Sequence, residues 1–271
     1  MDPSNGVQIP QRLVELLHSA PSIVVLTGAG ISAESSVPTF RQKQISQKQI
    51  SQEPMGQEQI GQSQSGLWSR YDPEELATPQ AFRRNPELVW RWYTWRRELI
   101  SGVAPNAGHQ ALVEMEQHFP QFTLITQNVD GLHQQAGSRR VIELHGNIQR
   151  NKCFAENRVV GSWSETGEIP PRCPVCGGML RPDVVWFGES LPQDALESAW
   201  KAASNCQVFF SIGTSGIVEP AASLPYIALH TGAVVVEINP NPTPLTAQAT
   251  YVLPGPAGSV LPELLAALSR A

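Results

Sequence analysis

The sequence predicts an α/β fold built on a doubly wound, Rossmann-like parallel sheet, with a smaller helical lobe inserted into it. Short apolar runs rich in β-branched residues alternate with segments of helical periodicity along most of the chain, and this alternation is typical of parallel sheets. Two long segments without that rhythm interrupt it. The expected strands are 22–27, 122–126, 141–144, 208–212, 234–238 and 251–253, and the expected helices are 11–19, 32–36, 107–117, 194–203, 221–229 and 261–268.

The two interruptions predict the smaller lobe. Residues 41–105 contain five pentads that begin with Gln, at 42–66, and then a Trp-rich segment; residues 148–181 contain three of the four cysteines. The pentads have no apolar periodicity and their charges balance, which predicts a flexible insertion. We expect one domain over residues 1–271, with a Rossmann-like lobe at about 10–40, 106–147 and 182–271 and a small lobe at about 41–105 and 148–181.

Composition and charge exclude several classes of protein. Of the 271 residues, 41% are hydrophobic and 16% are charged, which is ordinary for a globular protein, and the net charge of −5 argues against direct nucleic-acid binding. No apolar run is long enough to cross a membrane, and the N-terminus does not have the pattern of a secretory signal. The close pair of cysteines at 173 and 176 fits a reducing compartment. We therefore expect a cytoplasmic protein; its oligomeric state cannot be read from the sequence.

A glycine-rich turn follows the first expected strand. Residues 28–33 fit the pattern G-x-G-x-x-A at a change from strand to helix, where a dinucleotide pyrophosphate can approach the backbone closely. A purely structural glycine turn explains the same residues equally well. The acidic residue that dehydrogenases place about 20 positions further on would fall inside the pentad repeat, so an ordinary dehydrogenase is a weaker interpretation.

Six motifs occur in a fixed order and carry a more specific resemblance. They are "TGAGISAESSVPTFR" (27–41), "TQNVDGLHQQAG" (126–137), "ELHGN" (143–147), "RPDVVWFGE" (181–189), "GTS" (213–215) and "EINP" (237–240). With these motifs the chain resembles the sirtuin family of NAD-dependent protein deacylases over roughly residues 10–270. The resemblance implies a Rossmann-like lobe, a zinc-ribbon-like small lobe, and proteins or peptides with acylated lysines as substrates.

The resemblance also implies a reaction. NAD is consumed as a co-substrate: the acyl-lysine oxygen attacks the ribose carbon that bears nicotinamide, and the products are nicotinamide, free lysine and O-acyl-ADP-ribose. His145 matches the general base that acts on a ribose hydroxyl, a role that suits an imidazole with a pKa near neutrality. A packed or exposed histidine near a strand end is the structural alternative.

The family's NAD-binding positions transfer to this chain residue by residue. Asn128 and Asp130 match its nicotinamide pocket, although the same residues form ordinary turns in other proteins. His109 and His133 match family positions that we interpret as structural. The implied NAD-binding set is Gly28, Ala29, Gly30, Ser32, Ala33, Glu34, Phe40, Arg41, Trp68, Gln127, Asn128, Asp130, Gly213, Thr214, Ser215, Asn239, Pro240, Asn241 and Ala257.

A helix expected after Pro86 carries a candidate determinant of acyl specificity. Tyr93 and Arg96 are three residues apart and lie near an apolar stripe. They match the pair that marks the sirtuin subgroup with a preference for acidic acyl chains such as succinyl and malonyl. An amphipathic helix whose arginine reaches solvent at the edge of the stripe is the alternative. The expected stripe is Leu88, Trp92, Trp95 and Leu99.

A second substrate-binding segment follows from the resemblance. The run "VVWFGE" (184–189) matches the family's peptide-binding strand, whose backbone pairs with the substrate; a strand buried inside a sheet is the alternative. The implied substrate-binding residues are Tyr93, Arg96, Val185, Trp186, Phe187, Gly188 and Glu189.

The cysteines supply three of the four ligands that the zinc site of this family has. The family holds zinc with two Cys-x-x-Cys pairs; here Cys173 and Cys176 form one pair, but Cys153 is followed by Glu156 where the fourth cysteine belongs. Structural zinc requires four ligands, so Glu156 or water would have to complete the site. Cys206 has the setting of a buried apolar residue.

We expect an NAD-dependent deacylase that prefers acidic acyl groups and removes acetyl groups more weakly. A protein ADP-ribosyltransferase, and an NAD-sensing interaction module without catalysis, remain the alternatives.

Overall fold

The computed structural model describes residues 7–37 and 72–270. Phe40, Arg41, Trp68 and the repeat at 42–66 lie outside the described residues. The described backbone forms two compact units, one at 7–37, 104–145 and 191–270 and the other at 72–103 and 146–190. The second unit includes residues 182–190, which the sequence assigns to the larger lobe, because β6 (Leu180–Val184) pairs with β4 (Gly146–Cys153).

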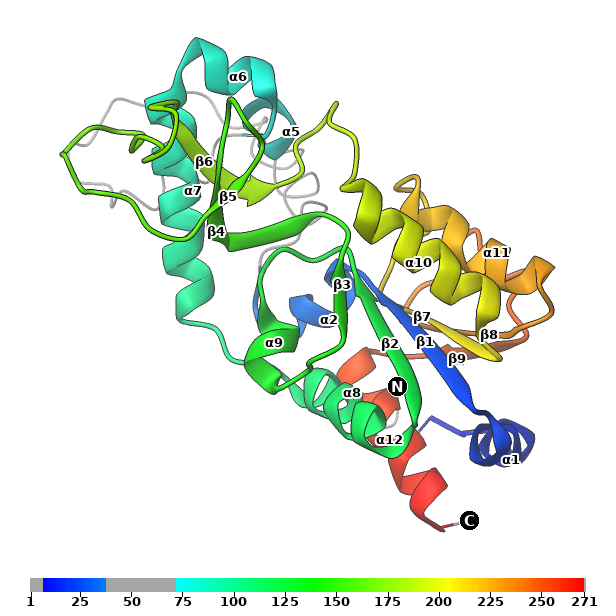
Figure 1. The fold of residues 1–271 in the computed structure, drawn as a ribbon. Helices are drawn as coiled ribbons and strands as arrows, with labels where there is room; N and C mark the ends of the chain where they lie inside the picture. Colours follow the sequence, from blue (N-terminus) through cyan, green and yellow to red (C-terminus); the bar gives the residue numbers. More distant parts are fainter. Residues whose placement is uncertain (1–6, 38–71, 271) are drawn as a thin grey trace, which may run out of the picture. The chain divides into compact units, whose positions relative to one another are not determined.

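The first unit is built on a six-stranded sheet (Figure 1). Its strand order is β3-β2-β1-β7-β8-β9, and every neighbouring pair is parallel. The order reverses between β1 and β7, which makes this the switch point of a doubly wound sheet. The predicted fold class is therefore confirmed. The strands are β1 (Ser22–Thr27), β2 (Gln121–Thr126), β3 (Val141–Glu143), β7 (Val208–Ile212), β8 (Val234–Asn239) and β9 (Tyr251–Pro254).

Helices cover both faces of this sheet (Figure 1). Three helices pack on one face: α1 (Gln11–Ser19), α8 (Ala107–His118) and α12 (Ala257–Arg270). The other face carries α10 (Gln193–Asn205), the short turn η1 (Ala221–Ser223) and α11 (Leu224–His230). Two short helices, α2 (Ala29–Ala33) and α9 (Leu132–Ala136), follow β1 and β2.

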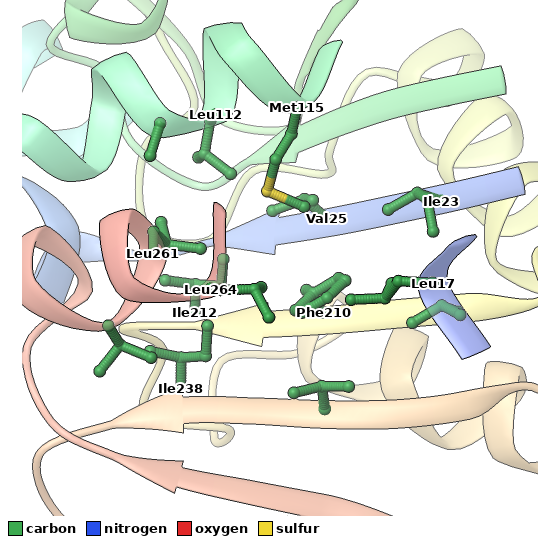
Figure 2. Packing of buried hydrophobic residues seen from close by; sticks show 14 of the residues in the cluster. Leu17, Ile23, Val25, Leu112, Met115, Phe210, Ile212, Ile238, Leu261 and Leu264 are labelled. Atoms are coloured by element: carbon green, nitrogen blue, oxygen red, sulfur yellow. The ribbon is translucent and has the colours of Figure 1, made fainter. Parts of the chain in front are cut away.

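The two cores of the first unit follow from the alternation of side chains along β1. Ile23 and Val25 belong to the core beneath α1, α8 and α12, whereas Val24 and Leu26 belong to the core beneath α10 and α11. Figure 2 shows the first core, in which side chains from β1, β7, β8, α8 and α12 gather. Each fully buried aliphatic side chain of this kind contributes about 1.5–3 kcal/mol. This burial on both faces fixes the strand ends that carry the candidate site.

The second unit contains the helices α5 (Pro73–Leu76), α6 (Pro79–Arg84) and α7 (Pro86–Ser101) and an antiparallel sheet in the order β5-β4-β6. Strand β5 is short (Val159–Val160). Each helix begins with the same device, a proline directly after a capping side chain. The caps are Asp72, Thr78 and Asn85, which accept hydrogen bonds from the backbone N–H of Glu74, Ala81 and Leu88.

Two predictions about local structure are wrong in detail. The helix after the glycine turn begins at Ala29 rather than Ser32, because Gly28 is extended and serves as the cap, so the turn occupies a single residue. In α7 the buried residues are Val89, Trp92, Tyr93 and Ile100, and Leu99 is 39% exposed. The buried face is therefore rotated from the expected stripe, toward Tyr93 and Arg96. Within the described residues, no helix is long and apolar enough to span a membrane.

Candidate active site

The glycine turn after β1 packs directly against the loop after β7. Gly28 donates its N–H to the Ile212 carbonyl at 3.0 Å, and Gly30 donates to the Gly213 carbonyl at 2.8 Å. A Cβ at Gly30 would lie 2.7 Å from the Gly213 Cα, far inside normal contact. Gly213 itself has φ of +60°, which favours glycine. The glycines therefore bring the ends of β1 and β7 together at the switch point, where doubly wound sheets bind their ligands.

Asn128 is held at the end of β2 by the backbone of the glycine turn. Its side-chain N–H groups donate to the Gly28 carbonyl and to the Ser32 hydroxyl, both at 3.0 Å. Its backbone N–H donates to the Thr126 hydroxyl at 3.1 Å. Because both amide hydrogens point into the protein, the side chain presents its carbonyl oxygen on the other side.

Asp130 lies in the same segment and is 8% exposed. Burial raises the pKa of its carboxyl group, and hydrogen bonds from the Leu132 N–H and the Ser32 hydroxyl partly offset that rise. The Leu132 N–H bond, at 2.9 Å, fixes one carboxylate oxygen at the start of α9. Asn128 and Asp130 thus share Ser32 as a neighbour, so the structure brings these sequence-predicted residues together.

His145 follows β3 and is tied to Gln127 at the end of β2. Its Nδ1 lies 2.8 Å from the Gln127 carbonyl oxygen. Since a carbonyl only accepts, Nδ1 carries the hydrogen and Nε2 retains its lone pair. Burial lowers the pKa of the imidazole below its ordinary value, and the bond to Gln127 partly offsets that shift. The ring is therefore neutral near pH 7, with Nε2 able to accept a proton.

A row of buried polar side chains that the sequence did not predict lies at the ends of β1 and β2. Thr27 and Thr126, opposite each other on β1 and β2, are joined by a hydrogen bond of 2.9 Å between their hydroxyls. The Thr27 hydroxyl also lies 2.9 Å from His133 Nε2. The rings of His133 and His109 are 4.9 Å apart between centroids. Threonines at the ends of two apolar strands are the one signal in the sequence that could have indicated this row of polar side chains.

His109 and His133 are fully enclosed by the protein. His109 is 0% and His133 is 1% exposed. Burial lowers the pKa of His109 to about 4 and that of His133 to about 3, with the neighbouring His109 a second cause for His133. His109 Nδ1 accepts the Asn106 N–H at 3.3 Å. His109 Nε2 and His133 Nδ1 have no hydrogen-bond partner within the part of the chain that the structure describes. Their structural interpretation agrees with this setting.

The remaining predicted NAD-binding residues of the first unit lie after β7 and β8 and at the start of α12. Asn239 donates to the Thr214 carbonyl at 2.7 Å and accepts from the Asn241 N–H at 3.5 Å. The carboxylate of Glu34 accepts the Gly258 N–H at 3.0–3.1 Å, which places Glu34 next to the first turn of α12. Of the other predicted residues, Ser215 and Pro240 lie in the loops after β7 and β8, Ala29 and Ala33 are the ends of α2, and Ala257 is the first residue of α12.

Glu237 is another buried polar residue to which the sequence did not assign a role of its own. It is 2% exposed although it carries a carboxylate inside the apolar strand β8. The hydroxyls of Thr243 and Thr246 donate to it. These bonds tie the loop after β8 to the strand itself, and a lone charge within "VVVEI" was the available signal.

In the second unit, Tyr93 and Arg96 lie on the buried side of α7. The Trp186 Nε1–H donates to the Tyr93 hydroxyl at 2.9 Å, and the Arg96 guanidinium lies 4.9 Å from the centroid of the Trp92 ring. Burial raises the pKa of Tyr93, opposed by Arg96 and by the Trp186 hydrogen bond. Burial lowers the pKa of Arg96, opposed by Tyr93. Tyr93 therefore keeps its hydroxyl hydrogen at neutral pH.

The run 185–189 is not a strand, contrary to the sequence-based prediction. Strand β6 ends at Val184, and a turn follows in which the Glu189 N–H donates to the Trp186 carbonyl at 2.9 Å. Gly188 has φ of +84°, which breaks the extended backbone. Val185 and Glu189 are partly buried, whereas the Phe187 side chain is 48% exposed.

Arg181 organises this turn, a role that its position in the sequence did not indicate. It is 2% exposed and donates from both terminal nitrogens to the Glu189 carboxylate, at 2.5 and 3.0 Å. Its guanidinium lies 3.2 Å from the centroid of the Trp186 ring. Burial acts to raise the pKa of Glu189, but hydrogen bonds from Arg181 and the Trp186 N–H hold it below its ordinary value. Trp186 is thereby fixed on two sides.

Three of the cysteines form one cluster. The Sγ atoms of Cys153, Cys173 and Cys176 all lie within 4.8 Å of one another, an arrangement of soft donors that suits zinc. Glu156 is not part of this cluster; its carboxylate pairs with Arg158 at 3.1 Å. Cys206 is buried apart from them, and burial raises its pKa to about 11.

Comparison with known proteins identifies the family. The sequence model described as "Sir2 family" matches residues 56–220, which is more than half of the chain. The chain belongs to the Sir2 family. Among relatives of this Sir2 protein, one from Aquifex aeolicus named NAD-dependent protein deacylase is 54% identical over 226 residues, 83% of this chain and 86% of its own length. One from Pyrobaculum aerophilum named NAD-dependent protein deacylase 2 is 50% identical over 259 residues, 96% of each chain.

Solved Sir2 structures share the whole fold. A structure described as a Sir2 homolog–NAD complex matches with a TM-score of 0.82 and 44% identity, over 98% of this chain and 96% of the other. A structure described as Sir2–p53 peptide–NAD⁺ matches with a TM-score of 0.75 and 27% identity, over 97% and 100%. The family identity predicted from the six motifs is confirmed.

Proposed function

We propose that this protein removes acyl groups from lysine side chains of proteins and consumes NAD in the reaction, with release of nicotinamide and O-acyl-ADP-ribose. Membership of the Sir2 family and the names of its relatives support the NAD-dependent deacylase activity. The observation on which the chemistry depends is the 2.8 Å contact between His145 Nδ1 and the Gln127 carbonyl oxygen, from which the tautomer of the ring follows.

The proposed NAD site lies at the carboxyl ends of β1, β2, β7 and β8, around the switch point. Bound NAD supplies the ribose carbon from which nicotinamide departs. The Asn128 carbonyl oxygen and the Asp130 carboxyl are suited to a carboxamide, which both donates and accepts hydrogen bonds. Burial raises the pKa of Asp130, and its carboxyl group, already fixed by the Leu132 N–H, is suited to accept a hydrogen bond from the carboxamide N–H.

His145 acts as the proposed general base. Its Nε2 is an acceptor at neutral pH, because burial disfavours the charged imidazolium. A base that is already neutral does not first have to lose a proton, and proton transfer of this kind contributes about 10²–10⁴-fold to the rate. The Gln127 carbonyl then stabilises the ring when Nε2 receives the proton, since it continues to accept from Nδ1–H.

The acidic-acyl preference is a further part of the proposal and depends on Tyr93, Arg96 and Trp186. An indole N–H can only donate, so Tyr93 must accept the bond from Trp186 and its own O–H must point elsewhere. Tyr93 thus offers a donor, and Arg96 adds a positive charge that is partly removed from water. A donor and a cation together favour a carboxylate over the methyl group of an acetyl chain.

The test compares matched peptides that carry acetyl-, succinyl-, malonyl- or glutaryl-lysine, with release of nicotinamide and of the free lysine both measured. Arg96→Met should lower kcat/KM for the succinyl peptide by roughly 10–100-fold, as expected for loss of a charge-assisted hydrogen bond of about 1.5–3 kcal/mol. It should change the acetyl peptide much less. Arg91→Met is the matched control, since Arg91 is an exposed arginine on the same helix.

Two results would contradict this proposal. Equal losses on both peptides in Arg96→Met would remove the acidic-acyl preference but leave the deacylase activity intact. Transfer of labelled ADP-ribose to protein without release of any acyl group would instead identify an ADP-ribosyltransferase.

A further inference from the structure

Two turns of the second unit have the same backbone pattern. In the first, the Cys153 N–H donates to the Arg158 carbonyl at 2.8 Å and the Asn157 N–H donates to the Cys153 carbonyl at 2.9 Å. In the second, the Cys173 N–H donates to the Gly178 carbonyl at 2.7 Å and the Gly177 N–H donates to the Cys173 carbonyl at 2.9 Å. The fourth residue after each cysteine has positive φ, +51° at Asn157 and +73° at Gly177.

This repetition aligns the two turns residue by residue. Cys153 corresponds to Cys173, and Glu156 corresponds to Cys176. The Sγ of Cys176 lies 3.3 Å from that of Cys153, well beyond the length of a disulfide bond, about 2.05 Å. The cluster is therefore made of reduced thiols, and position 156 is where its symmetry would place a fourth one.

The Glu156 side chain does not fill that place. The sulfur of a cysteine is bonded directly to Cβ. The carboxylate oxygens of a glutamate lie three bonds from Cβ, so they cannot occupy the same place. Its carboxylate pairs with Arg158 at 3.1 Å, and both side chains are nearly half exposed. The group of mutually close metal-ligating atoms found among the described residues contains only the three thiols. Ala155 and Cys176 are also exposed, so this side of the cluster faces solvent.

The donor set fits a metal with one exchangeable position rather than a closed structural site. Structural zinc is held by four protein ligands, whereas sites with three protein ligands keep a fourth position for water or a small molecule. Thiolate sulfur is among the ligands that Zn²⁺ binds, so a thiol suits that position as well as water does. The two turns bring the three sulfurs within 4.8 Å of one another.

We propose that Cys153, Cys173 and Cys176 bind Zn²⁺ as three thiolates and that the fourth coordination position, next to Glu156, is open and takes a small thiol from solution. Each cysteine thiol releases one proton to solvent when it binds the metal. The incoming thiol releases one more and displaces water, so no oxidant or reductant is required.

Cobalt substitution tests this proposal independently of the enzymatic activity. The full-length protein is loaded with one equivalent of Co²⁺ without oxygen, and its thiolate-to-cobalt absorption in the near ultraviolet is recorded while 2-mercaptoethanol is added. The wild-type band should grow by about one third, because four thiolates replace three. Ethylene glycol, the corresponding alcohol, should have no such effect.

Two variants of the exposed residue serve as matched controls. Glu156→Cys should show the four-thiolate band without added thiol, should not respond to 2-mercaptoethanol, and should release its metal more slowly to a chelator. Glu156→Ala should behave like the wild type, and the circular dichroism of both variants should be unchanged. The proposal is overturned if the wild type binds no cobalt or does not respond to the thiol. It is also overturned if Glu156→Ala changes the spectrum, because the carboxylate would then be the fourth ligand.

Discussion

Two pairs of site residues, one pair in each unit, differ in the contacts that hold them. In the parallel-sheet unit, Asn128 and His145 are tied to backbone carbonyls of neighbouring strand ends. In the second unit the corresponding contacts join side chain to side chain, as between Trp186 and Tyr93 or between Arg181 and Glu189. Backbone contacts survive substitution of the neighbouring residue, whereas side-chain contacts change with it. We therefore expect substitutions in the first unit to affect every substrate equally, and those in the second to alter the choice among substrates.

The largest expected effect tests the first half of this comparison. His145→Ala removes the proposed base and should lower kcat by about 10²–10⁴-fold on acetyl and succinyl peptides alike. NAD affinity, measured by calorimetry, should change little, because the side chain's role concerns proton transfer. His118→Ala, a histidine in the last turn of α8, is the control. Turnover within tenfold of the wild type would remove His145 from the mechanism.

The buried histidine pair should make the first unit sensitive to acid. In the unfolded chain both rings have a pKa near 6.5, whereas in the folded protein the pKa of His109 is about 4 and that of His133 about 3. The unfolded chain therefore binds protons first, and stability is lost as the pH falls below about 6.5. Between pH 7 and pH 5 the loss should be about 2 kcal/mol for each ring.

Urea unfolding at several pH values measures this loss. The double variant His109→Asn and His133→Gln places an amide near each nitrogen that bonds to Asn106 or Thr27, but it cannot titrate. Its stability should vary much less between pH 7 and pH 5 than that of the wild type. An unchanged slope would show that other groups control the acid sensitivity.

The smallest expected effect sharpens the second half of the comparison. Trp186→Phe keeps an aromatic ring beside Arg181 but removes the hydrogen bond to the Tyr93 hydroxyl. The hydroxyl is then free to rotate, so the preference for succinyl over acetyl peptides should fall about fivefold, in line with a neutral hydrogen bond worth about 1 kcal/mol. The loss should appear in KM for the succinyl peptide, with kcat for the acetyl peptide unchanged.

Trp200→Phe is the matched control for this variant, since the Trp200 ring is 41% exposed. A loss of the same size on both peptides, or a lowered melting temperature, would indicate that Trp186 acts only through stability.

The sheet and its order of elements could be predicted because burial on both faces leaves a clear record in the sequence. β1, β7 and α1 have the predicted bounds, and the other strands of the first unit differ by one residue at an end. Continuous apolar runs ended by glycine or polar residues produce this agreement. The family, too, could be identified from its motifs: five of them lie at or directly after the carboxyl ends of strands of the first unit, and the sixth, at 181–189, lies on β6 and the turn after it.

Contacts between side chains far apart in the sequence could not be predicted in the same way. The stripe expected on α7 differs from the buried face because large apolar and aromatic side chains occur on more than one face of this helix. Periodicity alone therefore does not decide which face is buried. The strand expected at 184–189 follows from the resemblance to the family's peptide-binding strand, and the positive φ of Gly188 reveals the break in the extended backbone. The equal spacing of Cys153 and Glu156 and of Cys173 and Cys176 indicates two matching turns, but the partnership of Arg181 with Glu189 depends on backbone geometry that no spacing records.

The alternation along β1 has a consequence for which genetic changes this protein can accept. Neighbouring side chains of β1 serve opposite cores, and the strand leads directly into Gly28, which is aligned with the end of β7. Losing or gaining one codon within 22–27 would exchange the two apolar sets and shift the loop by one residue. Natural variation in this segment should therefore consist of replacements that preserve its length.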